Sequence, residues 1–176
     1  MAAYFRSLEV TLSLRFNPTD QITRLADLCR KTNQFNLALR RFNEVELADR
    51  LGRSDACVAS IQLSDRLSDS GIIAIIVGHR QGEMLRIEEL CISCRALGRK
   101  LEDTLVLEGI RQMPIFAGCQ TLAFQVENGP RNQPALEWLA HSLGLSDLPE
   151  PGWHQFPVHS FLAGKAAEGV NISKEL

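Results

Sequence analysis

The sequence predicts one α/β (α+β) domain, in which helices cover both faces of a mixed β-sheet. Three observations predict this class. Apolar and polar residues alternate through residues 9–16, which is the period of a half-buried strand. Three strand-like runs later follow one another with no helix between them, which indicates an antiparallel meander. Helical and strand-like runs then alternate towards the end of the chain, which requires helices packed against the sheet.

In the first half of the chain, a strand is followed by two helices and the meander. After the strand at 9–16, a turn at 17–20 leads into a helix whose apolar stripe ends near Lys31. A second, short helix begins at Asn43, because Asn43 and Glu46 have the spacing of a capping box. The meander is predicted at residues 57–63, 72–78 and 84–93, with turns at 69–71 and 81–83.

In the second half, helices and strands alternate. A helix is expected from about Lys100, with Gly109 on its inward face. A strand at 121–126, a helix from Pro134 and a short strand at 153–158 follow. We expect residues 1–162 to form one domain and residues 163–176 to be a flexible tail, because the tail has no apolar pattern.

The composition excludes some classes of function. The chain has 176 residues, 45% of them hydrophobic and 23% charged, as is typical of a globular domain. A net charge of −2 argues against nucleic-acid binding. No apolar run approaches the roughly 20 residues that span a bilayer, and the first residues lack a signal-peptide pattern. We therefore expect a cytoplasmic protein with no nucleic-acid or membrane partner.

The five cysteines predict neither a disulfide framework nor a metal site. Their number is odd and they are scattered, and four of them lie in apolar segments, where a free cysteine behaves as a small hydrophobic residue. Cys91 and Cys94 have CxxC spacing, but a zinc site would need a second pair of ligands. We expect no metal in this domain.

A basic turn with the sequence CRALGRKLE, residues 94–102, is the most distinctive local feature. It precedes a helix, whose N-terminus offers free N–H groups and the positive end of the helix dipole. Gly98 would let a phosphate approach the backbone, and Arg95, Arg99 and Lys100 supply positive charge. The alternative is a solvated basic turn, because Glu102 and Asp103 would themselves satisfy the dipole.

The order of strands and helices resembles the GNAT acetyltransferase fold. In that fold a turn of pattern R/Q-x-x-G-x-G/A after the fourth strand holds the pyrophosphate of acetyl-CoA. Here Arg95 and Gly98 match the first arginine and first glycine, and Lys100 replaces the last small residue. The resemblance implies that coenzyme A or phosphopantetheine is the cofactor. The cofactor-binding residues that it implies are Arg95, Leu97, Gly98, Arg99, Lys100 and, before a later helix, Asn132.

Three longer blocks resemble the C-terminal, GNAT-like half of FkbH-like proteins. They are KTNQFNL with RRF (residues 31–42), IEEL with SCRALGR (residues 87–99) and GPRNQPA (residues 129–135). The likeness covers roughly residues 5–145. It implies loading of a glyceryl unit from a phosphorylated three-carbon acid onto an acyl carrier protein, for polyketide extender units such as methoxymalonyl. In that family a haloacid-dehalogenase-type (HAD) domain precedes this half, so an acyl carrier protein and a HAD domain, fused or separate, are the implied partners.

Three residues are candidates for catalysis. Glu88 and Glu89 follow each other on a predicted strand, so one should face the cleft and one the opposite side, as a general base or as ordinary polar positions. Cys94 is either a nucleophile beside basic residues or a buried structural cysteine. The one tyrosine, Tyr4, lies far from the helix where the resemblance would place a phenol that protonates the leaving thiolate.

Four polar residues are candidates for binding the substrate. Asn33, Gln34 and Asn36 would hydrogen-bond an acyl group or pantetheine amides, or would serve as helix-capping and turn residues. Arg40, beside Arg41, would pair with a phosphate or with acids of a carrier protein, or would lie on a solvated face. Asn132, placed above at the pantetheine or nucleotide end together with Arg131, has helix capping as its alternative.

These observations lead to three hypotheses. The first is an acyltransferase-like domain of the FkbH type that binds CoA or a carrier-bound phosphopantetheine arm between splayed central strands. The second is a non-catalytic docking module for a carrier protein, which the missing tyrosine and Lys100 favour. The third is a GNAT N-acyltransferase that uses acetyl-CoA on a small amine.

Overall fold

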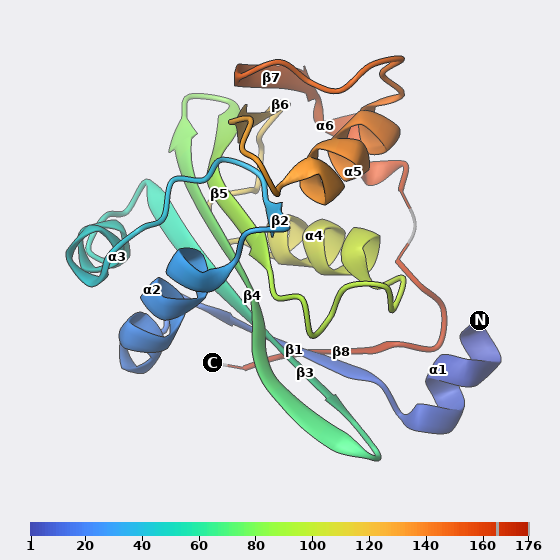
Figure 1. Ribbon diagram of the computed structural model, residues 1–176. Helices are drawn as coiled ribbons and strands as arrows, with labels where there is room; N and C mark the ends of the chain where they lie inside the picture. The colour runs from blue at the N-terminus through green and yellow to red at the C-terminus, as the bar shows by residue number, and fades with distance from the viewer. Residues whose placement is uncertain (165, 176) are drawn as a thin grey trace.

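The computed structural model describes residues 1–164 and 166–175. In these residues a mixed sheet with the strand order β7-β6-β5-β4-β3-β1-β8 forms the centre, and β2 lies beside β5 (Figure 1). The strands are β1 (Thr11–Phe16), β2 (Phe35–Asn36), β3 (Ala56–Asp65), β4 (Ser68–Gln81), β5 (Met84–Ile92), β6 (Thr121–Val126), β7 (Gly152–Pro157) and β8 (Asn171–Lys174). The pairs β1–β8 and β5–β6 are parallel, and the other pairs are antiparallel.

Helices cover both faces of the sheet. They are α1 (Ala2–Leu8), a 3₁₀ turn η1 (Thr19–Gln21), α2 (Ile22–Lys31), α3 (Glu44–Leu51), α4 (Glu102–Arg111), α5 (Gln133–Leu143) and α6 (Val158–Leu162). α2 and α3 bury their apolar side chains in one hydrophobic cluster with β3, β4 and β5. α4 and α5 bury theirs in a larger cluster on the opposite face (Figure 1). The mixed sheet with helices on both faces confirms the predicted class.

Some elements differ from the prediction. The hairpin turn lies at Arg66–Leu67 and not at 69–71, because Asp65 Oδ1 accepts hydrogen bonds from the N–H groups of Leu67 and Ser68. The helices α1 and α6 and the strands β2 and β8 were not predicted. The segment expected to be a flexible tail contains β8, which pairs with β1 from Thr11 to Leu14. No helix in the described part of the chain is long and apolar enough to cross a membrane.

Gly109 allows α4 to pack closely on the sheet. A Cβ atom at this position would lie 2.6 Å from Ile76 Cδ1 and 3.1 Å from Ile61 Cδ1. The first of these contacts is shorter than real Cβ atoms make, so a side chain here would require the Ile76 side chain or the helix itself to shift. The prediction that Gly109 faces inward is confirmed.

The central strands β5 and β6 separate halfway along their length. They pair in parallel only from Met84 to Ile87, opposite residues 121–124. Beyond this point the space between them is occupied by the chain itself. Phe35 and Asn36 pair with Ile92 and Cys91 of β5. The next residue, Leu37, accepts a hydrogen bond from the N–H of Glu127 just after β6 and donates its own N–H to Leu90 O.

A β-bulge in β5 changes the direction of its side chains. The pairing with β4 moves from Val77–Glu89 to Gly78–Ile87, so Glu88 is the extra residue. Two successive side chains, Glu88 and Glu89, therefore both point towards the α2–α3 face. The expectation that they face opposite sides was wrong, because it assumed the regular alternation of an unbroken strand.

Candidate functional site

One pocket is lined by residues of all three sequence blocks, and we call it the three-block pocket. It lies at the C-terminal end of β5 beside β2 and has a volume of about 420 Å³. Its polar lining includes Lys31, Asn33 and Gln34 from the first block, Cys94 and Arg95 from the second, and Arg131 from the third. Three segments far apart in the sequence thus meet at one site, next to the point where the central strands have separated.

Two buried asparagines hold the loop that forms one wall of this pocket. Asn36 Nδ2 donates to Thr32 O at 3.2 Å, and its Oδ1 accepts from Leu39 N at 2.8 Å. Asn132 Nδ2 donates to Asn36 O at 3.0 Å and to Glu127 O at 2.8 Å. Both side chains are occupied by the backbone, so they support β2 and do not face the pocket.

The Asn132 side chain does not cap the helix, as its alternative interpretation expected. It is the N-cap residue of α5, but its side chain makes no capping hydrogen bond to the helix. Its Oδ1 instead accepts the N–H of Gly129 at 2.8 Å. Asn132 therefore joins the loop before α5 to β2.

Arg41 closes the C-terminal end of α2. Its Nη1 donates to the carbonyl oxygens of Arg30 at 2.8 Å and of Cys29 and Thr32 at 3.2 and 3.3 Å. Its Nη2 donates to Asn33 Oδ1 at 2.8 Å. These contacts satisfy carbonyl groups that a helix end leaves free, so Arg41 fixes the position of Asn33 at the pocket.

Arg40 lies outside the pocket. Its Nη1 is 3.2 Å from Glu46 Oε1, and its guanidinium lies over the ring of Phe42 at 4.8 Å. The predicted phosphate contact of Arg40 stays a prediction, and the structure places the side chain beside α3.

Cys94 is exposed in the pocket wall, whereas the other four cysteines are buried. The interpretation of Cys94 as a buried structural cysteine was therefore wrong: the residue follows the end of β5, in an exposed turn that lines the pocket. The expectation that the other four behave as small hydrophobic residues is confirmed.

We expect a thiol-specific reagent such as dithiobis(nitrobenzoate), an aromatic disulfide, to react quickly with one of the five thiols in the native protein. Cys29, Cys57 and Cys91 have no exposed surface and Cys119 is 7% exposed, so only Cys94 is accessible. Absorbance of the released thiolate would count the reactive groups before and after denaturation. Cys94→Ser should abolish the fast phase, and a fast phase that survives this substitution would contradict the assignment.

The basic turn is divided between two places. Arg95 lines the three-block pocket, whereas Gly98, Arg99 and Lys100 line a different cavity of about 440 Å³ beside α1. The N–H of Gly98 donates to Glu102 Oε1 at 3.0 Å, and Arg99 Nη1 lies 3.4 Å from Asp65 Oδ2.

Leu97 packs against the core, and Lys100 has a positive φ of 59°. Because the N–H of Gly98 is bound to the carboxylate of Glu102, the amide that a phosphate would use is already occupied. This arrangement favours the solvated-turn alternative for residues 98–100 and leaves Arg95 as the residue of the turn nearest the three blocks.

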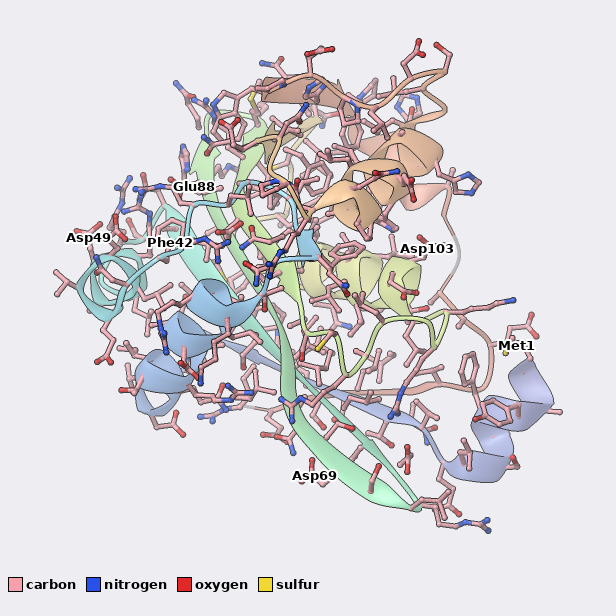
Figure 2. All side chains as sticks on the ribbon, viewed as in Figure 1. Met1, Phe42, Asp49, Asp69, Glu88 and Asp103 are labelled. Atoms are coloured by element: carbon pink, nitrogen blue, oxygen red, sulfur yellow. The ribbon has the colours of Figure 1, made fainter. Side chains whose placement is uncertain are left out.

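Glu88 forms a half-buried ion pair with Arg50 of α3. Arg50 Nε and Nη2 donate to its two carboxylate oxygens at 2.9 and 3.0 Å, and His79 Nδ1 lies 3.4 Å away. Burial would raise the pKa of Glu88, but hydrogen bonds and charge from Arg50 outweigh it and lower the pKa below its usual value. Figure 2 shows Glu88 on the side of the sheet that carries Phe42 and Asp49.

Glu89 is fully buried under the loop that follows β2. Its Oε2 accepts the N–H of Arg41 at 2.8 Å, and its Oε1 has no hydrogen-bond partner among the described residues. Burial raises the pKa of Glu89 to about 7, against the lowering effect of backbone N–H groups in the loop. Its carboxylate oxygen and the sulfur atoms of Cys29 and Cys91 all lie within 4.8 Å of one another. Neither glutamate lines the three-block pocket.

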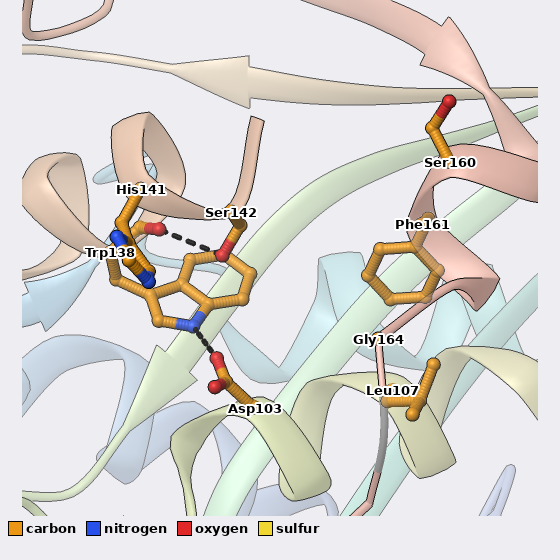
Figure 3. Close-up of a pocket in the computed structure, with 8 residues that line it drawn as sticks. All are labelled: Asp103, Leu107, Trp138, His141, Ser142, Ser160, Phe161 and Gly164. Carbon is orange, nitrogen blue, oxygen red and sulfur yellow. Dashed lines mark hydrogen bonds between the residues drawn. The ribbon is translucent and has the colours of Figure 1, made fainter. Parts of the chain in front are cut away.

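A third, smaller pocket of about 240 Å³ lies between α4, α5 and α6 (Figure 3). The indole N–H of Trp138 donates to Asp103 Oδ1 at 2.8 Å, and Ser142 Oγ donates to Trp138 O at 2.8 Å. Trp138 stands on the helix where the resemblance implies a phenol, and its N–H is already bound. Tyr4 is on α1, beside the cavity that holds Lys100. No candidate site residue lines the smaller pocket.

Sequence reasoning missed Arg24 as a residue of the three-block pocket. Arg24, Asp27 and Lys31 lie on one face of α2 at spacings of three and four residues, and both cations contact the Asp27 carboxylate. This helical spacing was readable in the sequence. That the face points at the end of β5 depends on how α2 packs on the sheet.

Comparisons with known proteins agree with this fold. No family model and no curated protein matches the sequence. Among solved structures, PaiA N-acetyltransferase from Thermoplasma acidophilum in complex with coenzyme A matches with a TM-score of 0.59 at 12% identity, over 83% of this chain and 98% of that chain. A mutant of the spermidine N-acetyltransferase SpeG from Vibrio cholerae matches with a TM-score of 0.57 at 10% identity, over 86% and 96%.

Diaminobutyrate acetyltransferase EctA from Paenibacillus lautus, in complex with L-2,4-diaminobutyric acid and coenzyme A, matches with a TM-score of 0.51 at 13% identity, over 83% and 93%. Sequence identities this low establish the fold alone. The chain has the fold of the GNAT acetyltransferases.

Proposed function

We propose that this chain is an acyltransferase domain that binds a pantetheine thioester, with CoA as the free form, and passes the acyl group to a small amine. One observation carries the proposal. In a sheet of the GNAT fold, β5 and β6 separate after Ile87, and the three-block pocket opens at the end of β5 beside this separation. The complexes of PaiA and EctA with coenzyme A support a CoA-type donor.

The fit of CoA to this chain differs between its two ends. Arg95 and Arg131 in the three-block pocket suit the phosphate end. The pantetheine arm does not fit beside the C-terminal half of β5, because Phe35 and Asn36 already use its backbone hydrogen-bonding groups. The arm would have to pass over β2 or replace it.

No side chain stands out as a dedicated acid or base at the pocket. Glu88 is neutralised by Arg50, and Glu89 is buried behind the loop of residues 38–41. Holding the thioester and the amine close together supplies much of the rate acceleration of acyl transfer by itself. The chain's contribution in this proposal is therefore mainly binding and positioning.

A second candidate is the carrier-protein function of FkbH-type proteins, including a docking role without catalysis. It is favoured by the hydrogen bonds that Leu37 makes to both β5 and the residue after β6, which close the space where an arm would lie. A domain closed in this way suits recognition of a carrier protein and its phosphate, with a HAD-type partner doing the chemistry.

Isothermal titration with CoA, acetyl-CoA and a carrier protein with and without its phosphopantetheine arm tests these functions. The acyltransferase proposal expects CoA to bind with micromolar affinity. It also expects the acetyl-CoA thioester to be consumed in the presence of small amines, which chromatography would detect. Binding of the carrier protein without binding of CoA would support the second candidate. The absence of binding by CoA and acetyl-CoA at millimolar concentration would overturn the acyltransferase proposal.

A further inference from the structure

Positive charge dominates the three-block pocket. Arg24, Lys31, Arg95 and Arg131 line it, and no aspartate or glutamate does. The chain as a whole carries a net charge of −2, so this concentration of cations is local. A concave surface lined by charge of one sign concentrates ligands of the opposite sign.

The charges on α2 are only partly compensated. One carboxylate, that of Asp27, serves three cations: Arg24 at 3.4 Å, Lys31 at 2.8 Å and Arg30 at 2.7 Å. The side-chain hydrogen bonds of Lys31 and Arg30 lower the pKa of Asp27, so it stays ionised at neutral pH. A single negative charge shared by three cations leaves a positive excess beside the pocket.

The other two cations have no acidic partner in the described parts of the chain, residues 1–164 and 166–175. Arg95 Nη2 donates to Ile72 O at 3.3 Å, and its Nε is 3.5 Å from Ser93 Oγ. These bonds are long and leave further N–H groups of the guanidinium available, because the group has five donors. Arg131 is exposed in the third block, and its side chain makes no hydrogen bond to any residue that the structure describes.

The pocket also has neutral donors and an apolar wall. Gln34 is exposed beside the cations, and its side-chain amide is not hydrogen-bonded within residues 1–164 and 166–175. Phe35 and Ile92, which face each other in the β2–β5 pair, form the apolar part of the lining together with Leu28 of α2. Since β2 closes the space between the central strands, the polar rim of the pocket is where a ligand's charged group can bind.

We infer that the three-block pocket binds a phosphate or carboxylate group of the substrate and excludes polyamines. Two sources supply this chemistry: the phosphate end of CoA, or an anionic group on a small acyl donor or acceptor. The inference rests on the proposed function only where CoA is the source. It also separates this chain from the spermidine N-acetyltransferase SpeG, because a polyamine such as spermidine would meet four cationic side chains in the pocket.

The test measures binding of CoA, pantetheine, inorganic pyrophosphate and spermidine to the full chain at two salt concentrations. We expect pyrophosphate and CoA to bind, pantetheine to bind at least tenfold more weakly than CoA, and spermidine not to bind. Arg95→Ala with Arg131→Ala should weaken pyrophosphate binding about 100-fold, since each removes a charge-assisted hydrogen bond worth about tenfold. Raising the salt concentration should weaken it further.

Arg66→Ala is the matched control, because Arg66 is an exposed arginine at the turn between β3 and β4. It should leave binding unchanged. The thermal unfolding temperature of each variant would show that the substitutions have not unfolded the protein, as expected for two arginines on the surface.

The outcomes separate this inference from the proposed function. If CoA and pantetheine bind equally and the double variant has no effect, the anion site is wrong and the acyltransferase proposal stands. If pyrophosphate binds through both arginines but CoA does not, the anion site stands with a small substrate as its source, and the acyltransferase proposal fails. Competition between spermidine and pyrophosphate for the pocket, or no anion binding at all, would overturn the inference.

Discussion

Asn132→Ala is expected to lower the free energy of unfolding by about 3 kcal/mol, because it removes three hydrogen bonds to backbone groups, one of them fully buried. The Asn132 side chain is 1% exposed and binds Gly129 N–H, Asn36 O and Glu127 O, all at 2.8–3.0 Å. A buried backbone group that loses its hydrogen bond costs more than the net energy of the bond. The loss should also loosen β2, since Asn132 joins the loop before α5 to Asn36.

Urea unfolding followed by circular dichroism measures this effect, with the m-value as a check that the unfolding transition is unchanged. Asn128→Ala is the control: this asparagine is exposed in the same loop, and its substitution should cost less than about 0.5 kcal/mol. Asn132→Asp should be at least as destabilising as alanine, because a carboxylate would face two carbonyl oxygens. A loss below 1 kcal/mol in both Asn132 variants would show that the contacts to β2 are dispensable.

Glu89→Gln is expected to make the protein more stable at pH 8 by about 3 kcal/mol and to change little below pH 4.5. Burial raises the pKa of Glu89 from 4.5 to about 7 in the folded protein. The folded state therefore binds more protons than the unfolded state between these values. The stabilising contribution of the protonated carboxyl is complete below about pH 4.5 and is lost as the pH rises through about 7.

Glutamine has the shape of the protonated acid and does not titrate. Its oxygen can accept the N–H of Arg41 in place of Oε2, and its amide would face the sulfur atoms of Cys29 and Cys91. Urea unfolding of both proteins from pH 5 to 8.5 gives the stability difference at each pH. Glu137→Gln, at an exposed position of α5, should show no such dependence. A constant difference between Glu89→Gln and the unsubstituted protein would mean that Glu89 is ionised throughout this range.

The sequence identified some residues of the candidate pocket, but it did not distinguish them from buried polar residues nearby. Asn33, Gln34, Cys94 and Arg95 were named from their blocks, and they do meet in one pocket. Asn36 and Asn132 were named for the same reason but are buried, and the Asn132 side chain donates to Asn36 O across 96 residues of sequence. Residue type marks both groups as polar, and only the packing of β2 against α5 decides which ones face solvent.

The sequence by itself determined the mixed sheet, the meander, the positions of α2, α3, α4 and α5, and the burial of four cysteines. These features depend on local periodicity, capping residues and hydrophobic pattern, which short windows of sequence contain. Gly109 belongs to the same group, because an inward-facing glycine in an apolar helix stripe already indicates a close contact.

The tertiary structure alone decided how the site is built. β2 is only two residues long and has no periodic signal, yet it occupies the space between β5 and β6. The bulge at Glu88 depends on the register with β4 and turns both glutamates to one face. Arg99 contacts Asp65, and the N–H of Gly98 binds Glu102. Both residues line a different cavity from Arg95, so the basic turn is divided between two cavities. The pairing of β2 with β5 and the contact of Arg99 with Asp65 join segments that are distant in the sequence, where no local pattern specifies the partner.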